Sequence, residues 1–258
     1  MSWQSSMRER LARHGAHWVV PEWPASPRVR AFVTTRSGGV SAGEYGSLNL
    51  GSRGGDAPGN VERNRLIVRE MLPEAPRWLD QVHGSSVAVL DELDPREVPR
   101  ADAAVARSAE RVCAVLVADC MPVLLADEQG TRVAVAHAGW RGMSAGVIEN
   151  AVLAMDADPA TLLAWMGPAI GPEAFEVGPE VREAFVAGDP GAGVAFRPRG
   201  AGKYLADLYA LARRRLARAG VARVHGGGFC THRENQRFFS YRREKRSGRM
   251  GAFIWIEP

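Results

Sequence analysis

The chain has 258 residues, of which 46% are hydrophobic, enough to bury a substantial core in one large domain or two small ones. Its formal net charge of +4, from 33 basic and 29 acidic residues, is a mild excess that suits anionic small molecules, and the even spread of arginines argues against a nucleic-acid-binding protein. Three cysteines argue against a disulfide framework, and no apolar run reaches the roughly 20 residues that span a bilayer, so we expect a cytoplasmic protein without membrane contact.

The first part of the chain predicts a lead-in, a strand and a loop. Residues 1–28 are polar and rich in Pro and Trp, and we expect a short helix and a surface segment ahead of a single domain over 29–258. Val29–Thr34 alternates like a strand, and a long Gly-rich loop follows from Thr35 to Gly51. This loop is either a plain turn or a cradle for an anion, with Arg36 beside it.

The next elements surround the first histidine of interest. A helix is predicted over Val61–Leu72, with Asn60 as its N-cap and Pro73 at its end. Strands are predicted over Trp78–Val82 and Val87–Leu90, with His83 between them. A His before Gly in such a turn is usually a polar turn residue, although His is also the commonest metal ligand.

The stretch from Cys113 to Gly142 carries the most reactive residues. Three apolar runs predict strands there, at Ala114–Ala118, Val123–Ala126 and Val133–Ala136. Cys120 follows the first run, and His137 follows the third. A hairpin-like connection between strand ends therefore allows Cys120 and His137 to lie close together on a rigid scaffold.

The second half alternates helices and strands, which predicts a single α/β (α+β) domain. The Gly/Pro-rich stretch Ala187–Gly202 is expected to lack regular structure. The predicted helix Met143–Met155 begins directly after His137–Gly142, and the partial positive charge at its N-terminus would favour an anion there. The arginines of the predicted helix Tyr204–Ala219 either contact nucleic acid or form a solvated helix face, and we favour the solvated face. The predicted helices are Met143–Met155, Pro179–Val186 and Tyr204–Ala219, and the predicted strands are Thr161–Met166, Val221–Val224 and Ala252–Ile256.

Three side chains, His83, Cys120 and His137, are candidates for a shared metal ion. Two imidazoles and a thiolate suit Zn²⁺, and three protein ligands leave the fourth position open, as in catalytic sites. The spacing matches no standard zinc motif, so a buried Cys beside two unrelated turn histidines is the alternative. A second alternative is a Cys120–His137 nucleophile pair without metal. Cys113 is expected in the core, and Cys230 is a weaker candidate.

A series of short motifs, in order along nearly the whole chain, resembles the laccase-domain proteins, also called the polyphenol oxidase family and now described as purine nucleoside phosphorylases. The motifs are Asn49-Leu50-Gly51, Gly55-Asp56, Asn64-Arg65, Gln81-Val82-His83-Gly84, Ala101-Asp102-Ala103, Ala118-Asp119-Cys120-Met121-Pro122-Val123-Leu124-Leu125, Ala136-His137-Ala138-Gly139-Trp140-Arg141-Gly142, Gly167-Pro168-Ala169-Ile170-Gly171-Pro172, Phe239-Ser240-Tyr241-Arg242-Arg243 and Gly248-Arg249-Met250.

The resemblance implies a single domain in which central mixed β-sheets are sandwiched between helix layers, and a zinc ion held by His83, Cys120 and His137. It implies phosphorolysis of adenosine, inosine, guanosine and methylthioadenosine, together with adenosine deamination. Some members are linked to peptidoglycan fidelity, and older work described the family as copper laccases. We expect a monomer or a small homo-oligomer.

These activities assign provisional roles to further residues. In deamination, a zinc-activated water attacks C6 of adenine, and Asp119 is the candidate proton shuttle, with a structural hydrogen bond as its alternative role. In phosphorolysis, Arg36, Arg65 and Arg141 are the candidates for binding phosphate. A multicopper site fits poorly, because the chain has only six His. The alternatives are a metal-free cysteine hydrolase or deamidase that uses Cys120 and His137, and a non-enzymatic cell-wall fidelity factor.

Overall fold

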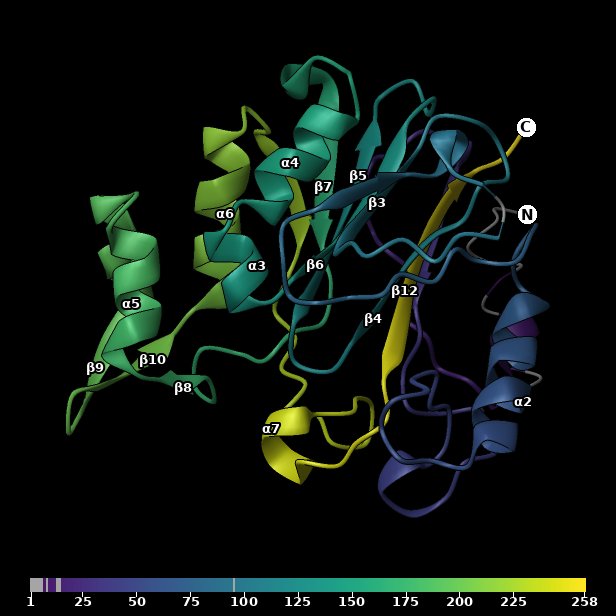
Figure 1. The fold of residues 1–258 in the computed structure, drawn as a ribbon, viewed down its shortest axis with the longest axis horizontal. Helices are drawn as coiled ribbons and strands as arrows, with labels where there is room; N and C mark the ends of the chain where they lie inside the picture. Colours follow the sequence, from purple (N-terminus) through teal and green to yellow (C-terminus); the bar gives the residue numbers. More distant parts are fainter. Residues whose placement is uncertain (1–6, 8, 13–14, 95) are drawn as a thin grey trace.

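A six-stranded mixed sheet forms the centre of the molecule (Figure 1). The computed structural model describes residues 7, 9–12, 15–94 and 96–258. The central pair of strands is an antiparallel hairpin in which Pro122 lies opposite His137. In spatial order the strands are β11 (Arg223–Gly226), β7 (Leu162–Met166), β5 (Met121–Asp127), β6 (Val133–Ala138), β3 (Ala103–Ala106) and β2 (Val87–Val89).

Strand β5 is apolar on both faces because both faces of the sheet are covered. Val123 and Leu125 pack into the core on one side, and Leu124 and Ala126 pack into the core on the other. Such doubly buried strands appear in sequence as continuous apolar runs. The three strands that these runs predicted, β4 (Cys113–Val117), β5 and β6, are confirmed to within two residues at each end.

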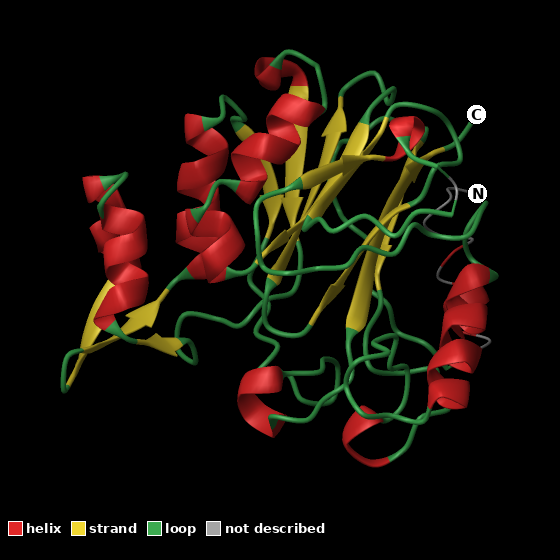
Figure 2. Ribbon diagram, viewed as in Figure 1, coloured by secondary structure: helices red, strands yellow, loops and turns green. Residues whose placement is uncertain are grey.

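A second sheet of three strands lies against one face of the first, as Figure 2 shows. Its outer face, which includes Phe32 and Phe253, packs on Trp18 and on α2, so that the sheets lie between helix layers, as expected for this α/β domain. The strands are β1 (Val29–Val33), β12 (Met250–Ile256) and β4 (Cys113–Val117), and the helix α2 spans Pro58–Arg69.

Two predictions for this side of the molecule are corrected. Asn60 is not the N-cap of α2, because the helix begins at Pro58, whose ring presets the helical φ and whose missing N–H is not needed there. The lead-in is not a pure surface segment, since Leu11 and Trp18 are buried and Val19 pairs with Val33. The prediction for residues 1–6, 8 and 13–14 lies outside the described residues.

The other face of the six-stranded sheet is covered by α3 (Trp140–Ser144), α4 (Val147–Ala154) and α6 (Leu208–Arg218). The single helix predicted over Met143–Met155 is therefore wrong. Gly146 has a φ of +92°, a left-handed conformation that interrupts the helix and that glycine adopts without steric cost.

A small sheet with α5 (Pro179–Val186) projects from the edge of the domain, at the left of Figure 1. The prediction of α5 is confirmed, but two neighbouring predictions are wrong. Tyr204 lies in a strand, and α6 begins only after Asp207, whose carboxylate caps it by accepting a hydrogen bond from Ala210. The stretch 187–202 is also partly regular. It contains a 3₁₀ helix over Pro190–Ala195 and the strand β9 (Phe196–Gly200), which pairs with β10 (Lys203–Ala206); β8 (Glu176–Val177) completes the small sheet.

The segment before His83 is extended but does not form the predicted strand Trp78–Val82. Instead, the amide side chain of Gln81 bonds to both the N–H and the C=O of Leu116 in β4. A side chain thus replaces the backbone ladder and leaves the main chain free to turn at His83. Short elements complete the described structure: α7 (Tyr241–Glu244) and 3₁₀ helices at Gly43–Tyr45, Leu90–Glu92 and Pro159–Thr161. Among the described residues, no helix combines the length and apolarity needed to cross a membrane.

Candidate metal centre

His83, Cys120 and His137 come together at one end of the central hairpin. Cys120 lies just before β5, His137 lies on β6, and the pairing of Met121 with Ala138 brings the two residues side by side. His83 reaches them from the loop before β2, with its ring centroid 4.9 Å from that of His137. One ligand atom from each of the three residues lies within 4.8 Å of the others. The predicted convergence of these side chains is therefore present.

Asp102 fixes the two histidines relative to each other. Its Oδ1 lies 2.9 Å from Nδ1 of His137, and its two carboxylate oxygens accept hydrogen bonds from the successive backbone amides of Val82, His83 and Gly84. These bonds support the unusual φ of +60° at His83. Because Nδ1 of His137 faces Asp102, its Nε2 is the nitrogen left for a metal ion, an arrangement typical of metal-ligating histidines.

The electrostatics of the cluster favour a thiolate. Burial opposes ionisation of Cys120, but the charge of His137 and hydrogen bonds from His137 and His83 outweigh it and lower the thiol pKa to about 6. Burial likewise opposes the charge on His137, but Cys120 and Asp102 raise its pKa to about 9. For Asp102, burial is outweighed by hydrogen bonds from His137 and Gly84, and its pKa is lowered. Both shifts favour a thiolate beside an imidazolium when no metal is bound.

Two glycines after His137 allow this close packing. A Cβ on Gly139 would lie 2.6 Å from Sγ of Cys120, and a Cβ on Gly142 would lie 2.7 Å from the carbonyl oxygen of Gly84. Neither distance is tolerable for a real Cβ atom. The glycines of this motif are therefore explained by the approach of the chain to Cys120 and to the turn at His83.

The donor set fits a divalent metal ion. A thiolate and two imidazoles are borderline-soft ligands that suit zinc, and Asp102 supplies the hydrogen bond that orients one of them. His137 and Asp102 are closed to solvent, whereas His83 is exposed, so the cluster is open on one side. An open side leaves room for a non-protein ligand in the fourth position.

Asp119 lies next to Cys120 with both carboxylate oxygens engaged. Oδ1 accepts the hydroxyl of Thr231 at 2.6 Å, and Oδ2 accepts the backbone amide of Arg242 at the start of α7 at 2.7 Å. These bonds tie the β4–β5 connection to the C-terminal loops and accompany a positive φ of +82° at Asp119. The geometry favours the structural role that the sequence left open over that of a proton shuttle.

The predicted phosphate-binding arginines lie in three different settings. Arg36 is ion-paired with Glu244 and donates to carbonyl oxygens of Gly46 and Asn235. Arg65 stacks on Trp78 and donates to the carbonyl of Leu50. Arg141 is exposed in the first turn of α3, within the motif that contains His137, and stacks on Trp140.

The Gly-rich loop between β1 and α2 uses several of its amides internally. The amides of Gly39, Val40 and Ser41 bond to Ser47 and to the buried side chain of Asn64. The same Asn64 donates to the carbonyl of Asn49. The structure therefore favours the plain-loop interpretation over an anion cradle.

Sequence reasoning missed the roles of Asp102 and Arg249. Ala101-Asp102-Ala103 was noted as a motif, but the carboxylate received no role, although a buried charge at the start of an apolar strand requires partners. Arg249 stands in a loop beside glycine, and nothing in its spacing indicates that its charge interacts with Cys120 and Asp119. Cys113 is fully buried with a raised thiol pKa, as expected for a core residue.

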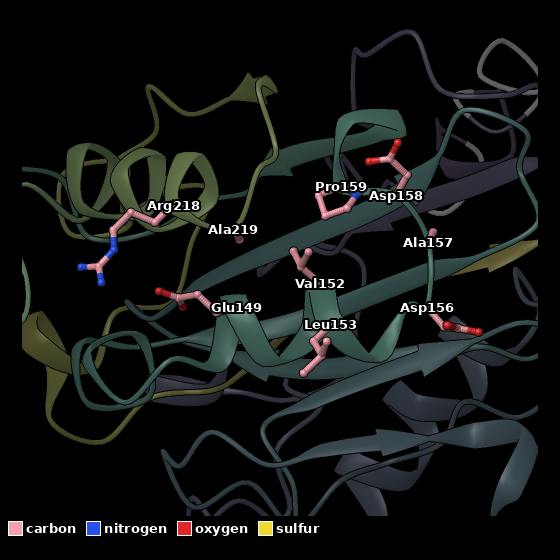
Figure 3. A pocket seen from close by; sticks show the side chains of 9 residues that line it. All are labelled: Glu149, Val152, Leu153, Asp156, Ala157, Asp158, Pro159, Arg218 and Ala219. Carbon is pink, nitrogen blue, oxygen red and sulfur yellow. The ribbon is translucent and has the colours of Figure 1, made fainter.

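A hollow of about 590 Å³ between α4 and α6 lies away from this cluster (Figure 3). Glu149 and Asp156 stand at opposite ends of the hollow, with Val152 and Leu153 between them. Glu149 already pairs with Arg215 at 2.9 Å. The hollow shows no convergent set of reactive side chains.

Comparison with known proteins gives a consistent picture. Residues 30–257 match the family described as multi-copper polyphenol oxidoreductase laccase. The chain is 52% identical over 241 residues to a Pseudomonas aeruginosa protein named purine nucleoside phosphorylase PA4543, covering 93% of this chain and 98% of that protein. It is 53% identical over 240 residues to the Escherichia coli protein named purine nucleoside phosphorylase YfiH, covering 92% of this chain and 98% of that protein. The crystal structure of Neisseria meningitidis protein NMB0706 superposes on this chain with a TM-score of 0.90 at 48% identity, covering 93% of this chain and 99% of that one.

Proposed function

The chain belongs to the multi-copper polyphenol oxidoreductase laccase family, and from this premise we propose that it is a zinc-dependent purine nucleoside phosphorylase that also deaminates adenosine. The resemblance seen in the sequence motifs is thereby confirmed. The proposed substrates are adenosine, inosine, guanosine and methylthioadenosine with inorganic phosphate, and the products are the free purine and the sugar 1-phosphate. The names of relatives about half identical to this chain support the phosphorylase activity.

One observation carries the proposal: the convergence of His83, Cys120 and His137 within 4.8 Å, on the open side of the domain. A zinc ion held by these three residues would supply a Lewis acid and an activated water. The chain's own residues then have defined tasks. Asp102 holds His137 in the tautomer that leaves Nε2 for the metal, and the depressed pKa of Cys120 keeps its sulfur in the ligating form near neutral pH.

The two reactions make different demands on the site. In phosphorolysis, a phosphate oxygen forms a bond to C1′ while the C1′–N9 bond breaks, and the leaving purine takes up a proton. In deamination, water adds to C6 of adenine and ammonia leaves. Both require an open position beside the ligand cluster, and the exposure of His83 supports one. The free state of Cys113, Cys120 and Cys230 supports action in the reducing cytoplasm.

Copper oxidase chemistry, which the family description suggests, is the weaker reading. A multicopper oxidase needs a blue-copper site and a separate histidine-rich cluster. Within the described residues, one group of three ligands meets the geometric requirement for a metal. One three-ligand group cannot build both sites.

A metal-free cysteine hydrolase is the second candidate, and the ionised state of Cys120 beside His137 favours it. Metal analysis separates the two. About one zinc per chain, with activity lost to a chelator and restored by zinc, supports the phosphorylase. Protein without metal that remains active and is inactivated by thiol alkylation supports the hydrolase.

The decisive experiment incubates the purified protein with inosine and phosphate, with and without a chelator. We expect hypoxanthine and ribose 1-phosphate in equal amounts, and neither product after metal removal or with Cys120→Ser. Adenosine is the companion substrate, with adenine as the phosphorolysis product and inosine as the deamination product. Hypoxanthine formation that does not depend on phosphate would contradict the phosphorylase proposal.

A further inference from the structure

Arg249 is held rigidly beside the Asn49-Leu50-Gly51 segment. Its backbone N–H donates to Oδ1 of Asn49 at 2.9 Å, and its carbonyl accepts the amide of Leu50 at 3.0 Å. Its side chain passes directly over Gly51, where an added Cβ would lie 2.6 Å from Cγ of Arg249. The course of the arginine side chain is therefore fixed by the backbone of this loop.

Of the three guanidinium nitrogens of Arg249, Nη1 is the one that makes hydrogen bonds within the described part of the chain. Nη1 donates to the carbonyls of Ser247 and Gly248 and lies 3.2 Å from Oγ of Ser247. Within the described residues, Nε and Nη2 make no hydrogen bond, and neither belongs to the buried unsatisfied atoms. No ion pair with a carboxylate is formed in the described part of the chain either. The Nε–Nη2 edge is thus fixed in place and open to a ligand.

The charge of Arg249 interacts with the catalytic end of the hairpin. Burial lowers the pKa of Arg249, and the opposing influences come first from Cys120 and Asp119, then from Tyr241 and Tyr45. A desolvated cation without an ion pair is costly. In the proposed holoenzyme the Cys120 thiolate is a metal ligand, and the Asp119 carboxylate already accepts hydrogen bonds from Thr231 and Arg242. The cation therefore lacks a dedicated anionic partner.

We propose that the free Nε–Nη2 edge of Arg249 binds the phosphate co-substrate beside the metal centre. This inference rests on the proposed phosphorylase function. The planar fork of a guanidinium matches two oxygens of a phosphate, which gives strong and oriented hydrogen bonds. Phosphate held there has a remaining oxygen free to form the bond to C1′ as the C1′–N9 bond breaks.

This assignment distinguishes Arg249 from Arg36 and Arg65, two of the three arginines predicted from sequence. Arg36 has a carboxylate partner, Glu244, and Arg65 is packed on Trp78. Arg249 also lies over a ring, that of Tyr241 at 5.7 Å, but Tyr241 precedes Arg242, whose backbone amide bonds to Asp119 beside Cys120. Arg249 is therefore close to the proposed metal ligands, and its charge interacts with Cys120. The rival interpretation is that Arg249 only balances the charges of Cys120 and Asp119.

The test compares Arg249→Gln and Arg249→Lys with the wild-type holoenzyme. Arg197→Gln is the control, since it removes the same charge from an exposed arginine paired with Glu173. The measurements are the KM values for phosphate and for inosine, the zinc content, and calorimetric binding of inorganic phosphate to the zinc-loaded protein. Because charged hydrogen bonds are worth about 1.5–3 kcal/mol, we expect Arg249→Gln to raise the phosphate KM and Kd about 10- to 100-fold. The KM for inosine and the zinc content should stay within twofold of wild type.

Each outcome separates this inference from the proposed function. If the wild type phosphorolyses inosine and Arg249→Gln binds phosphate with unchanged affinity, the inference about Arg249 is overturned and the proposed function stands. Loss of zinc together with unchanged phosphate binding supports the charge-balancing role instead. A wild type that binds phosphate through Arg249 but releases no base overturns the phosphorylase and leaves the binding site intact. A wild type that binds no phosphate overturns both. Arg249→Lys, which keeps the charge but not the fork, should lie between Arg249→Gln and wild type.

Discussion

Oδ1 of Asp102 lies 2.9 Å from Nδ1 of His137, and both side chains are closed to solvent. The same carboxylate accepts hydrogen bonds from the backbone N–H groups of Val82, His83 and Gly84. One buried side chain therefore positions one ligand on a strand and another on a loop. The carboxylate that holds the loop at His83 is thus also the group that would orient His137 toward a metal ion.

Asp102→Asn should weaken the metal centre although it is nearly isosteric. Its amide nitrogen would face either Nδ1 of His137 or the N–H groups of Val82 and Gly84, which already donate to Oδ2. Loss of such outer partners typically costs about 10- to 100-fold in metal affinity. We expect that loss in chelator competition, with activity falling in parallel at limiting zinc.

The control is Asp127→Asn, which alters another buried carboxylate, bonded to Thr131 and Arg132 at the β5–β6 turn. It should change the free energy of unfolding and leave zinc affinity as in wild type. Equal zinc affinity in Asp102→Asn and wild type would remove the positioning role of Asp102.

The thiol of Cys120 should titrate far below an ordinary cysteine in the metal-free protein. Burial disfavours the thiolate, but His137 and His83 stabilise it and lower the pKa to about 6. Alkylation by iodoacetamide should therefore rise as the pH increases through about 6 and then level off, whereas an ordinary thiol keeps gaining reactivity toward pH 9. Below pH 6 the neutral thiol predominates and the reaction slows.

The contribution of Cys120 is isolated by subtracting the rate measured with Cys120→Ser, because Cys230 is also partly accessible. Cys113 should not contribute, since it is fully buried and its pKa is raised. A midpoint near 9 for the Cys120-specific reaction would mean that the imidazoles do not stabilise the thiolate.

The strands around the site were predictable because doubly buried β5 and β6 appear as continuous apolar runs. The convergence of His83, Cys120 and His137 was also accessible to sequence reasoning, through residue chemistry and motif resemblance. The break at Gly146 and the late start of α6 at Asp207 were not, because a helical apolar pattern continues across both. Asp102 bonds to the loop at His83 and to His137 on β6, and the backbone of Arg249 bonds to Asn49, and no local sequence pattern records such distant contacts.

Asp119 offers a prediction that separates a structural from a chemical role. Asp119→Ala leaves the hydroxyl of Thr231 and the amide of Arg242 without their acceptor, which should lower the free energy of unfolding by about 1–3 kcal/mol. Denaturant unfolding measures that loss. Thr231→Val, which removes one of these bonds and leaves the carboxylate in place, should show part of it.

Activity of the same variants identifies a proton shuttle. If Asp119 is structural, phosphorolysis and deamination should fall together and in proportion to stability. A selective loss of adenosine deamination in Asp119→Ala, with Thr231→Val unaffected, would instead assign the proton transfer to Asp119.

Gly139→Ala tests the steric basis of the ligand motif by adding one methyl group. The backbone of Gly139 has a φ of −69° and ψ of 163°, which alanine adopts without strain, so backbone conformation does not account for the glycine. The new Cβ would lie 2.6 Å from Sγ of Cys120 and 3.5 Å from Cδ2 of His83. Sγ must move, and we expect zinc affinity to fall at least about tenfold while overpacking costs about 1–3 kcal/mol of stability.

Gly59→Ala is the matched control because it places the same methyl group in α2, where nothing lies within 4 Å of the new Cβ. Alanine is the better helix former, so this variant should gain up to about 1 kcal/mol of stability and keep wild-type zinc affinity. The two glycines thus predict opposite changes in melting temperature, and zinc loss in only one of them. Wild-type zinc affinity in Gly139→Ala would show that Sγ of Cys120 is not confined by the chain that follows His137.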